Sequence, residues 1–186
     1  TTAGTNADDS GKGLFKYAPP SGFLALCEDN LPAPAIADPG DHFKTVLYEG
    51  NGVARHPVSG VGFKPDFVWL KGREGSSLNH ILCDSVRGVK RTLFTNNQLA
   101  EYTDRGVNSF DEDGFTLFYP GGDENNDGIE YVAWCWKAGG PAVTNTDGSI
   151  NSSVSVNRDA GFSIVSYTGN NTNNTTVGHG LGKTPA

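Results

Sequence analysis

The sequence lacks long apolar runs and long runs of helix-forming residues. No stretch approaches the about 18 consecutive apolar residues of a membrane-spanning helix, and the N-terminus has no signal-like pattern, so we expect no membrane insertion. Runs rich in Ala, Leu, Glu and Lys are missing as well. Instead, Gly, Asn and Asp interrupt short apolar runs along the whole chain, which contains 25 glycines. This composition is typical of an all-β protein with many turns.

Positive charge is also scarce. The 14 Lys and Arg residues face 21 Asp and Glu residues, which gives a formal net charge of -7. Proteins that bind nucleic acid through its phosphates carry basic patches, and attachment to anionic membranes needs them too. We therefore expect neither partner.

Cysteine and histidine are few and scattered. Cys27, Cys83 and Cys135 each sit in an apolar context, which predicts small buried side chains. A metal site of zinc type would need Cys or His pairs at short spacing, and the sequence has none.

What the chain does contain is a repeated stretch. The segment 43–65, FKTVLYEGNGVARHPVSGVGFKP, returns at 162–185 as FSIVSYTGNNTNNTTVGHGLGKTP. Six identities occur at an offset of 119 residues, and three more follow after a one-residue insertion. This period is that of a whole small domain rather than of a solenoid repeat. The repeat predicts an arm at 1–41, a complete unit at 42–140, a linker at 141–160 and a truncated second unit at 161–186.

Within the complete unit, short apolar runs predict the strands of a β-sandwich-like, lectin- or jelly-roll-like module with little helix. Strands are expected at 43–48, 58–63, 67–71, 81–86, 115–119 and 131–136. The segment 98–102 is ambiguous, and one helical turn is an open alternative there. Val132, Trp134 and Trp136 share one alternation phase, which we assign to the core. Residues 1–13 are predicted to be an extended connector, and the prolines of 14–41 an irregular arm that lies on a neighbouring domain or subunit.

The string FKYAPPSGFLALCEDNLP, residues 15–32, resembles the tail that follows SPRY-like domains in large virion proteins of bacteriophages, marine phages in particular. The unit that follows is similar to the repeat found next in those proteins, through TVLYEGNG, GVGFKPDFVWLK, LCDSVRGV, SFDEDGFTL and YVAWCWKAGG. The resemblance implies a β-rich structural or adhesive module of a phage particle, in a tail fibre or other appendage. It implies no catalytic residues, so we expect no enzyme, and the proline-rich arm would be the end of a preceding SPRY-like domain.

From this resemblance we expect location in the virion, contact with other virion proteins and self-association, with a homotrimer as the working hypothesis. The alternative is a lectin-like adhesin whose loops bind host surface glycan. Trp69, Trp134, Trp136, Tyr119 and Tyr131 are candidates for sugar stacking, although aromatic residues in strands are more often core. The polar loops at 96–97 and 170–174 are the other candidates for sugar contacts.

The sharpest local motif is the acidic loop 123–130, DENNDGIE. Its alternating oxygens followed by Gly match the first half of a calcium loop. The twelfth position is Trp134, so the EF-hand pattern fails, and a solvated acidic hairpin is the favoured interpretation. Calcium remains the one possible cofactor, with Asp123, Asn125, Asp127 and Glu130 as its candidate ligands. Paired carboxylates for glycoside hydrolysis could be picked only arbitrarily from Asp111, Glu112, Asp113 and Glu130.

Overall fold

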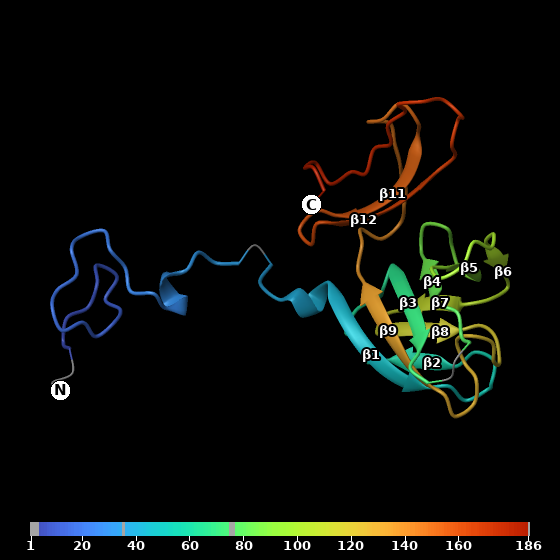
Figure 1. Ribbon diagram of the computed structural model, residues 1–186, viewed down its shortest axis with the longest axis horizontal. Coiled ribbons are helices and arrows are strands. Elements are labelled where there is room, and N and C mark those ends of the chain that lie inside the picture. The colour runs from blue at the N-terminus through green and yellow to red at the C-terminus, as the bar shows by residue number, and fades with distance from the viewer. Residues whose placement is uncertain (1–3, 35, 75–76, 186) are drawn as a thin grey trace. The chain divides into compact units, whose positions relative to one another are not determined.

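The computed structural model describes residues 4–34, 36–74 and 77–185. The chain divides into two compact units, Thr1–Ala37 and Asp38–Ala186. The first unit contains the short 3-10 helix η1 (Glu28–Asn30), and the second begins with η2 (Pro39–Asp41). The remaining regular structure is all strand (Figure 1). Its bounds are β1 (Phe43–Glu49), β2 (Pro57–Ser59), β3 (Phe67–Gly72), β4 (Ile81–Asp84), β5 (Arg91–Phe94), β6 (Tyr102–Thr103), β7 (Val107–Asp111), β8 (Gly114–Leu117), β9 (Glu130–Trp136), β10 (Val143–Asn145), β11 (Ser152–Asn157) and β12 (Phe162–Tyr167).

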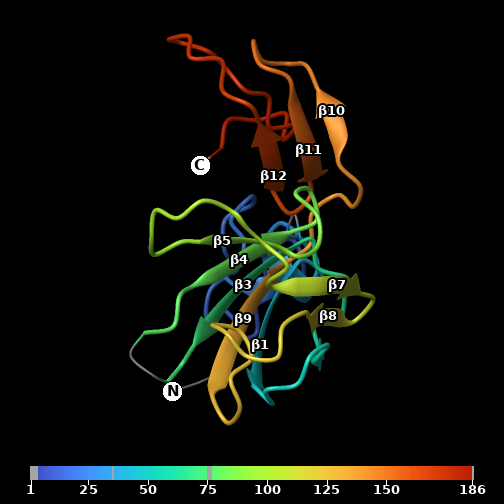
Figure 2. The same ribbon diagram turned by 90° about the vertical axis from the view of Figure 1, so that its right-hand side faces the viewer.

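The strands form three antiparallel sheets, which confirms the all-β prediction. One has six strands in the order β1-β9-β3-β4-β5-β6, and the others have the orders β2-β8-β7 and β10-β11-β12. Strands β7 and β8 lie against one face of the six-stranded sheet (Figure 2). This arrangement is β-sandwich-like. The helical turn that the sequence left open at 98–102 does not form, because this segment is irregular up to the short strand β6.

The core lies between the six-stranded sheet and β2-β8-β7. Across five strands of the larger sheet, paired positions supply one row of buried side chains, namely Val46, Ala133, Leu70, Ile81 and Phe94. Phe115, Leu117 and Val107 of the smaller sheet have no exposed surface and belong to the same core. Burial of this apolar surface is the main driving force for folding of the module.

The assignment of Val132, Trp134 and Trp136 to the core is wrong. These three side chains are half-buried on the outer face of β9, and Tyr131, Ala133 and Cys135 occupy the core face. The reason is space. Packed sheets lie about 10 Å apart, and Phe115 and Phe63 already fill much of that layer, so the small Ala133 and Cys135 suit the facing positions of β9. Tyr131 lies near the start of β9, where it stacks on Tyr48.

The first unit is built around one carboxylate rather than around an apolar core. Asp8 accepts hydrogen bonds from the backbone nitrogens of Ser10, Lys12 and Ala25, and from the side chain of Asn30. The backbone of Asn6 pairs with that of Phe15, which closes the loop between them. The predicted extended connector is therefore wrong for residues 4–13. The unit's large apolar side chains are instead exposed, namely Leu14, Tyr17, Phe23, Leu24, Leu26 and Leu31.

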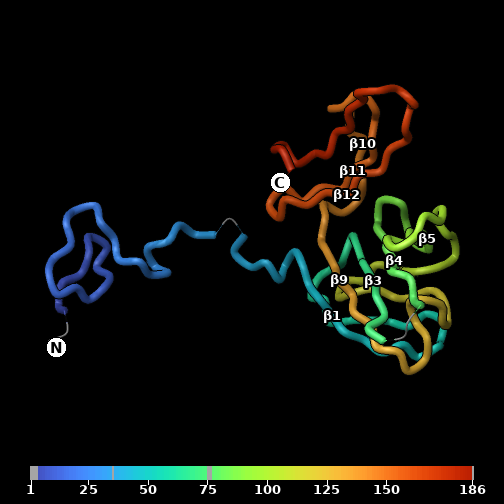
Figure 3. The backbone as a smooth tube through the Cα atoms, in the orientation of Figure 1, coloured from blue at the N-terminus to red at the C-terminus, as the bar shows by residue number. Residues whose placement is uncertain are grey.

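The two copies of the repeated stretch share an unusual backbone pattern. Residues in the left-handed region of φ recur at equivalent positions, as the pairs Gly52 and Asn171, Arg55 and Asn174, Gly60 and Gly180, and Gly62 and Gly182. Such conformations are uncommon outside glycine. The path of the second copy, from β12 to residue 185, can be followed in Figure 3. The strand partners differ, since β1 pairs with β9 whereas β12 pairs with β11.

Candidate functional site

The second copy of the repeat is joined to the first by aromatic side chains. Phe162 of β12 stacks on Trp136, with ring centroids 6.1 Å apart, and meets Phe67 edge-on at 5.8 Å. Phe43, the equivalent of Phe162 in the first copy, packs on the same Trp136 at 4.8 Å. Trp136 is thus shared by the first strand of both copies. Aromatic pairs of this kind add about 0.5–1.5 kcal/mol beyond the burial of their area.

Hydrogen bonds reinforce this joint. The Asn157 side chain donates to the carbonyl oxygen of Lys137 at 3.2 Å and contacts His42 Nδ1 at 3.0 Å. The Ser155 hydroxyl accepts from the Gly139 nitrogen and donates to the Gly140 oxygen. Because these bonds link the end of β9 to β11, the segment between them is tied at several points.

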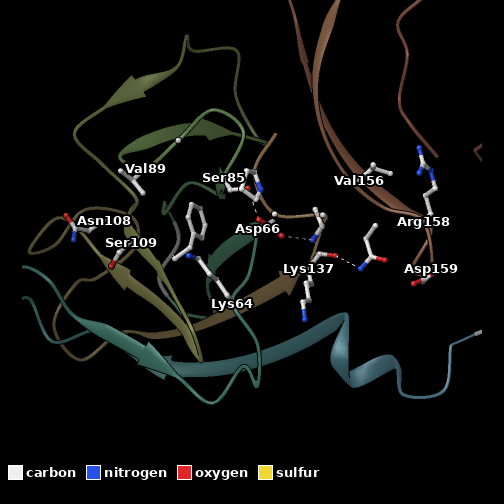
Figure 4. A pocket seen from close by; sticks show the side chains of 17 residues that line it. Lys64, Asp66, Ser85, Val89, Asn108, Ser109, Lys137, Val156, Arg158 and Asp159 are labelled. Atoms are coloured by element: carbon white, nitrogen blue, oxygen red, sulfur yellow. Dashed lines mark hydrogen bonds between the residues drawn. The ribbon is translucent and has the colours of Figure 1, made fainter. Parts of the chain in front are cut away.

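A cleft of about 1100 Å³ opens beside the joint (Figure 4). Its walls combine apolar side chains, such as Val89, Phe110 and Val156, with hydroxyl and amide groups. Asp66 lies in the wall and is nearly fully buried, where it accepts from the Ser85 hydroxyl and the Ala138 nitrogen, both at 2.9 Å. Its carboxylate is therefore used to hold the wall together.

The charges of the cleft do not converge. Lys64 lies along its floor, whereas the Lys137 amine points away from Asp66 and Ser85 (Figure 4). The Arg158 guanidinium is held at the carbonyl oxygen of Gly180, at 2.8 Å. The cleft is thus lined by charges of both signs, with Lys64, Lys137 and Arg158 beside Asp66 and Asp159, rather than by an anion-binding cluster.

The outer face of the six-stranded sheet carries a second concentration of aromatic residues. Paired positions across five strands place Thr45, Trp134, Trp69, Leu82 and Leu93 in one row. The Trp69 and Trp134 rings lie 5.3 Å apart, and the His80 ring lies 6.4 Å from Trp69. Of the other proposed sugar-stacking residues, Tyr131 is fully buried and Tyr119 is exposed beyond the end of β8.

The acidic loop is not the solvated hairpin that was predicted, because Glu124 and Asn125 have no exposed surface. The Asn125 side chain accepts from the Asn51 nitrogen at 3.0 Å and donates to the Val53 oxygen at 2.8 Å. Glu124 accepts from Arg105 and from the Gly106 nitrogen, both at 3.1 Å. Burial nevertheless raises the pKa of Glu124, and the nearby Arg105 charge only partly offsets this.

The four proposed calcium ligands have separate partners. Asp123 accepts from Asn79, and Glu130 forms an ion pair with Arg73 at 2.5 Å. Asp127 is exposed beside Gly52, and the Asn125 side-chain oxygen already accepts from the Asn51 backbone nitrogen. Within residues 4–34, 36–74 and 77–185, no three His, Cys, Asp or Glu side chains form a group that suits a metal ion. Calcium binding stays a prediction.

The carboxylates considered for hydrolysis also have structural partners. Asp113 accepts from the Gly60 and Gly62 nitrogens, and these bonds, that of Gly62 foremost, lower its pKa. Asp111 accepts from the Thr116 hydroxyl at 2.7 Å.

Among the described residues, no helix is both long and apolar enough for a membrane crossing.

The sequence was compared with models of known protein families. Residues 38–186 match the model of a domain of unknown function, DUF7483. The chain belongs to the DUF7483 family. The match covers the same residues as the second compact unit, so the β-sandwich-like module, the joint and the outer aromatic face all lie within the DUF7483 domain. Neither the curated proteins nor the solved structures contain a match to this chain.

Sequence reasoning missed two features of the DUF7483 domain. The burial of Glu124 and Asn125 depends on partners as far as 74 residues away, and no local pattern marks them. The outer aromatic row was visible as an alternation, because Phe67, Trp69, Trp134 and Trp136 fall on single phases of two strands. The sequence does not show which set of alternating positions in β3 and β9 faces the sheet β2-β8-β7.

Proposed function

We propose that the chain is a non-catalytic structural module of a bacteriophage virion, in a tail fibre or other appendage that contributes to host attachment. The observation that carries the proposal is the joint between the two copies of the repeat, where Phe162 packs on Trp136 and Phe67. A projecting appendage needs successive modules held in fixed order. A shared aromatic residue backed by the Asn157 hydrogen bonds provides such a connection.

The resemblance of residues 15–140 to phage virion repeats supports the same proposal. The proposed non-catalytic role is supported by the use of carboxylates as structural acceptors, since Asp66, Asp111 and Asp113 each hold neighbouring backbone or hydroxyl groups. The exposed apolar side chains of the first unit support self-association. Exposed patches of this kind mark interaction surfaces in many proteins.

Immunogold electron microscopy tests this proposal. Antibodies raised against residues 38–186 should label purified particles of the phage that encodes the chain, at a projecting appendage. Serum pre-adsorbed with the same fragment serves as the control. Particles that carry no label, while infected-cell lysate reacts strongly, would show that the chain is not a virion component.

A second candidate function is carbohydrate binding by a lectin-like adhesin. The outer row with Trp69 and Trp134 favours it, because indole rings on a solvent-facing sheet offer a stacking surface. This role is compatible with location in a virion.

A further inference from the structure

The composition of the outer sheet face is unusual for a surface in contact with water. An antiparallel sheet with one solvated face normally alternates apolar and polar residues. Here the outward positions of β3 and β9 carry Phe67, Trp69, Trp134 and Trp136. In the part of the chain that the structure describes, β2-β8-β7 packs on the opposite face. Tertiary packing within the sandwich therefore does not account for the outer indoles.

Strand β12 accounts for only one end of this face. Phe162 contacts Phe67 and Trp136, which lie at one end of their strands. Two residues along each strand, Trp69 contacts both Trp134 and His80. Their planes are tilted by 54°, so the two rings do not form a flat stack. Both indoles are half-buried and retain exposed surface.

A neutral polar cluster lies next to these rings. The Asn79 side-chain oxygen accepts from Asn96 at 3.1 Å and from Asn97 at 3.0 Å. The Asn96 side-chain oxygen accepts from the His80 backbone nitrogen, which fixes the cluster beside the His80 ring. Asn96 is exposed. Amide groups both donate and accept hydrogen bonds, so they suit a ligand rich in hydroxyl groups.

Two further observations extend the site. The Trp69 indole nitrogen is buried and has no hydrogen-bond acceptor among the described residues. Buried donors normally have a partner, so an orphan donor calls for an explanation. In addition, a groove of about 420 Å³ runs along β12 and is lined by Leu82 and Leu93 of the same outer row. The groove therefore adjoins the row and gives a chain-like ligand a second region of contact beside the indoles.

We propose that this face binds a neutral glycan, with the Trp69 and Trp134 rings stacked against one pyranose ring. The C–H groups on one face of a pyranose are apolar and slightly positive, and they complement the negative face of an indole. The neighbouring asparagines contact the hydroxyl groups, and further sugar units lie along the groove. A net charge of -7 disfavours acidic glycans through like-charge repulsion. The proposal names the ligand for the attachment role proposed above.

Affinity electrophoresis tests the site on the complete chain. Native gels cast with a panel of neutral polysaccharides (a β-glucan, a galactomannan, a mannan and an uncharged bacterial O-polysaccharide) are compared with a gel containing acidic alginate. We expect at least one neutral gel to retard the wild-type chain. Trp134→Ala and Trp69→Ala should each weaken the retardation at least tenfold, and Trp134→Phe should retain part of it. Tyr102→Ala removes an exposed aromatic residue that pairs with Thr92, outside the row, and is the matched control.

The outcomes separate this inference from the proposed function. Equal retardation of wild type and Trp134→Ala, retardation by alginate alone, or no retardation in any gel would overturn the glycan site. If Trp134→Ala lowers the mass of the purified protein's assembly in solution, the face is a protein contact. That result would also overturn the glycan site. None of these results affects the labelling of virions, which tests the structural role alone. Thermal unfolding of each variant shows whether it is folded.

Discussion

At the scale of single residues, the three cysteines are expected to differ in reactivity. Cys83 and Cys135 are buried in the core, and burial raises their thiol pKa values to about 11 and about 12. Because the thiolate is the reactive form, neither should react at pH 8 in the folded chain. Cys27 is partly exposed. Mass spectrometry after iodoacetamide treatment should show one modification in buffer and three in denaturant.

A Cys27→Ser variant supplies the control for this experiment. It should take up no label when folded and two labels when unfolded. Native labelling of Cys83 or Cys135 would mean that the sandwich opens more readily than its packing indicates.

Glu124 is expected to make stability depend on pH. Its pKa is raised by burial, so the folded state keeps a proton that the unfolded chain loses above its ordinary value of 4.5. The contribution to stability is complete below that value and is lost as the pH rises through the higher pKa of the folded state. Relative to Glu124→Gln, which does not titrate, the free energy of unfolding of the wild type should therefore fall as the pH rises from 4 to 7.

Urea unfolding of both proteins at a series of pH values measures this difference. The Gln variant loses the charge that faces Arg105, so a constant offset between the two curves is expected as well. A difference that does not change with pH, or one that changes in the opposite direction, would contradict the prediction.

At the scale of elements, Phe162 should decide whether the sheet β10-β11-β12 is held to the sandwich. Phe162→Ala removes both aromatic contacts of the joint. For a half-buried ring we expect a loss of about 2 kcal/mol, below the range for fully buried Phe. Hydrogen exchange should then speed up in β11 and β12 and stay unchanged in β3 and β9. Tyr167→Ala, on the same strand but largely exposed, is the control and should leave both regions as they are.

The elements also show how much the sequence could predict. Apolar runs located β1, β3, β4, β8 and β9, because each is long enough to show a pattern. Strand β6 has only two residues and exists through its pairing with β5, so no local signal marks it. The outer tryptophans were assigned to the wrong face, since alternation divides a strand into two faces without saying which one another sheet covers.

The site was less predictable than the fold for a related reason. Asp8 and Asn125 each organise a loop through backbone groups that are distant in sequence. Any backbone nitrogen can donate to a carboxylate or an amide, so residue types alone do not identify the partners. The sequence therefore favoured a solvated connector and a solvated hairpin where the structure has polar centres.

At the scale of the whole molecule, the first unit is expected to drive assembly. It exposes Leu14, Tyr17, Phe23, Leu24, Leu26 and Leu31, while its polar centre at Asp8 supplies little apolar burial. Burial of these exposed side chains against other copies of the chain favours association, because each Å² of buried apolar surface contributes about 25 cal/mol of free energy. Light scattering should give three times the chain mass for residues 1–186 and the mass of one chain for residues 38–186.

A point variant separates assembly through these side chains from other effects of the truncation. Leu26 is 96% exposed, so Leu26→Ser should leave the fold of the unit intact and still lower the fraction of trimer. Lys12→Ser removes an exposed ion pair with Asp29 in the same unit and should leave the mass unchanged, because exposed pairs contribute little. A single-chain mass for residues 1–186 would contradict self-association. An equal trimer with and without residues 1–37 would place the assembly surface within residues 38–186.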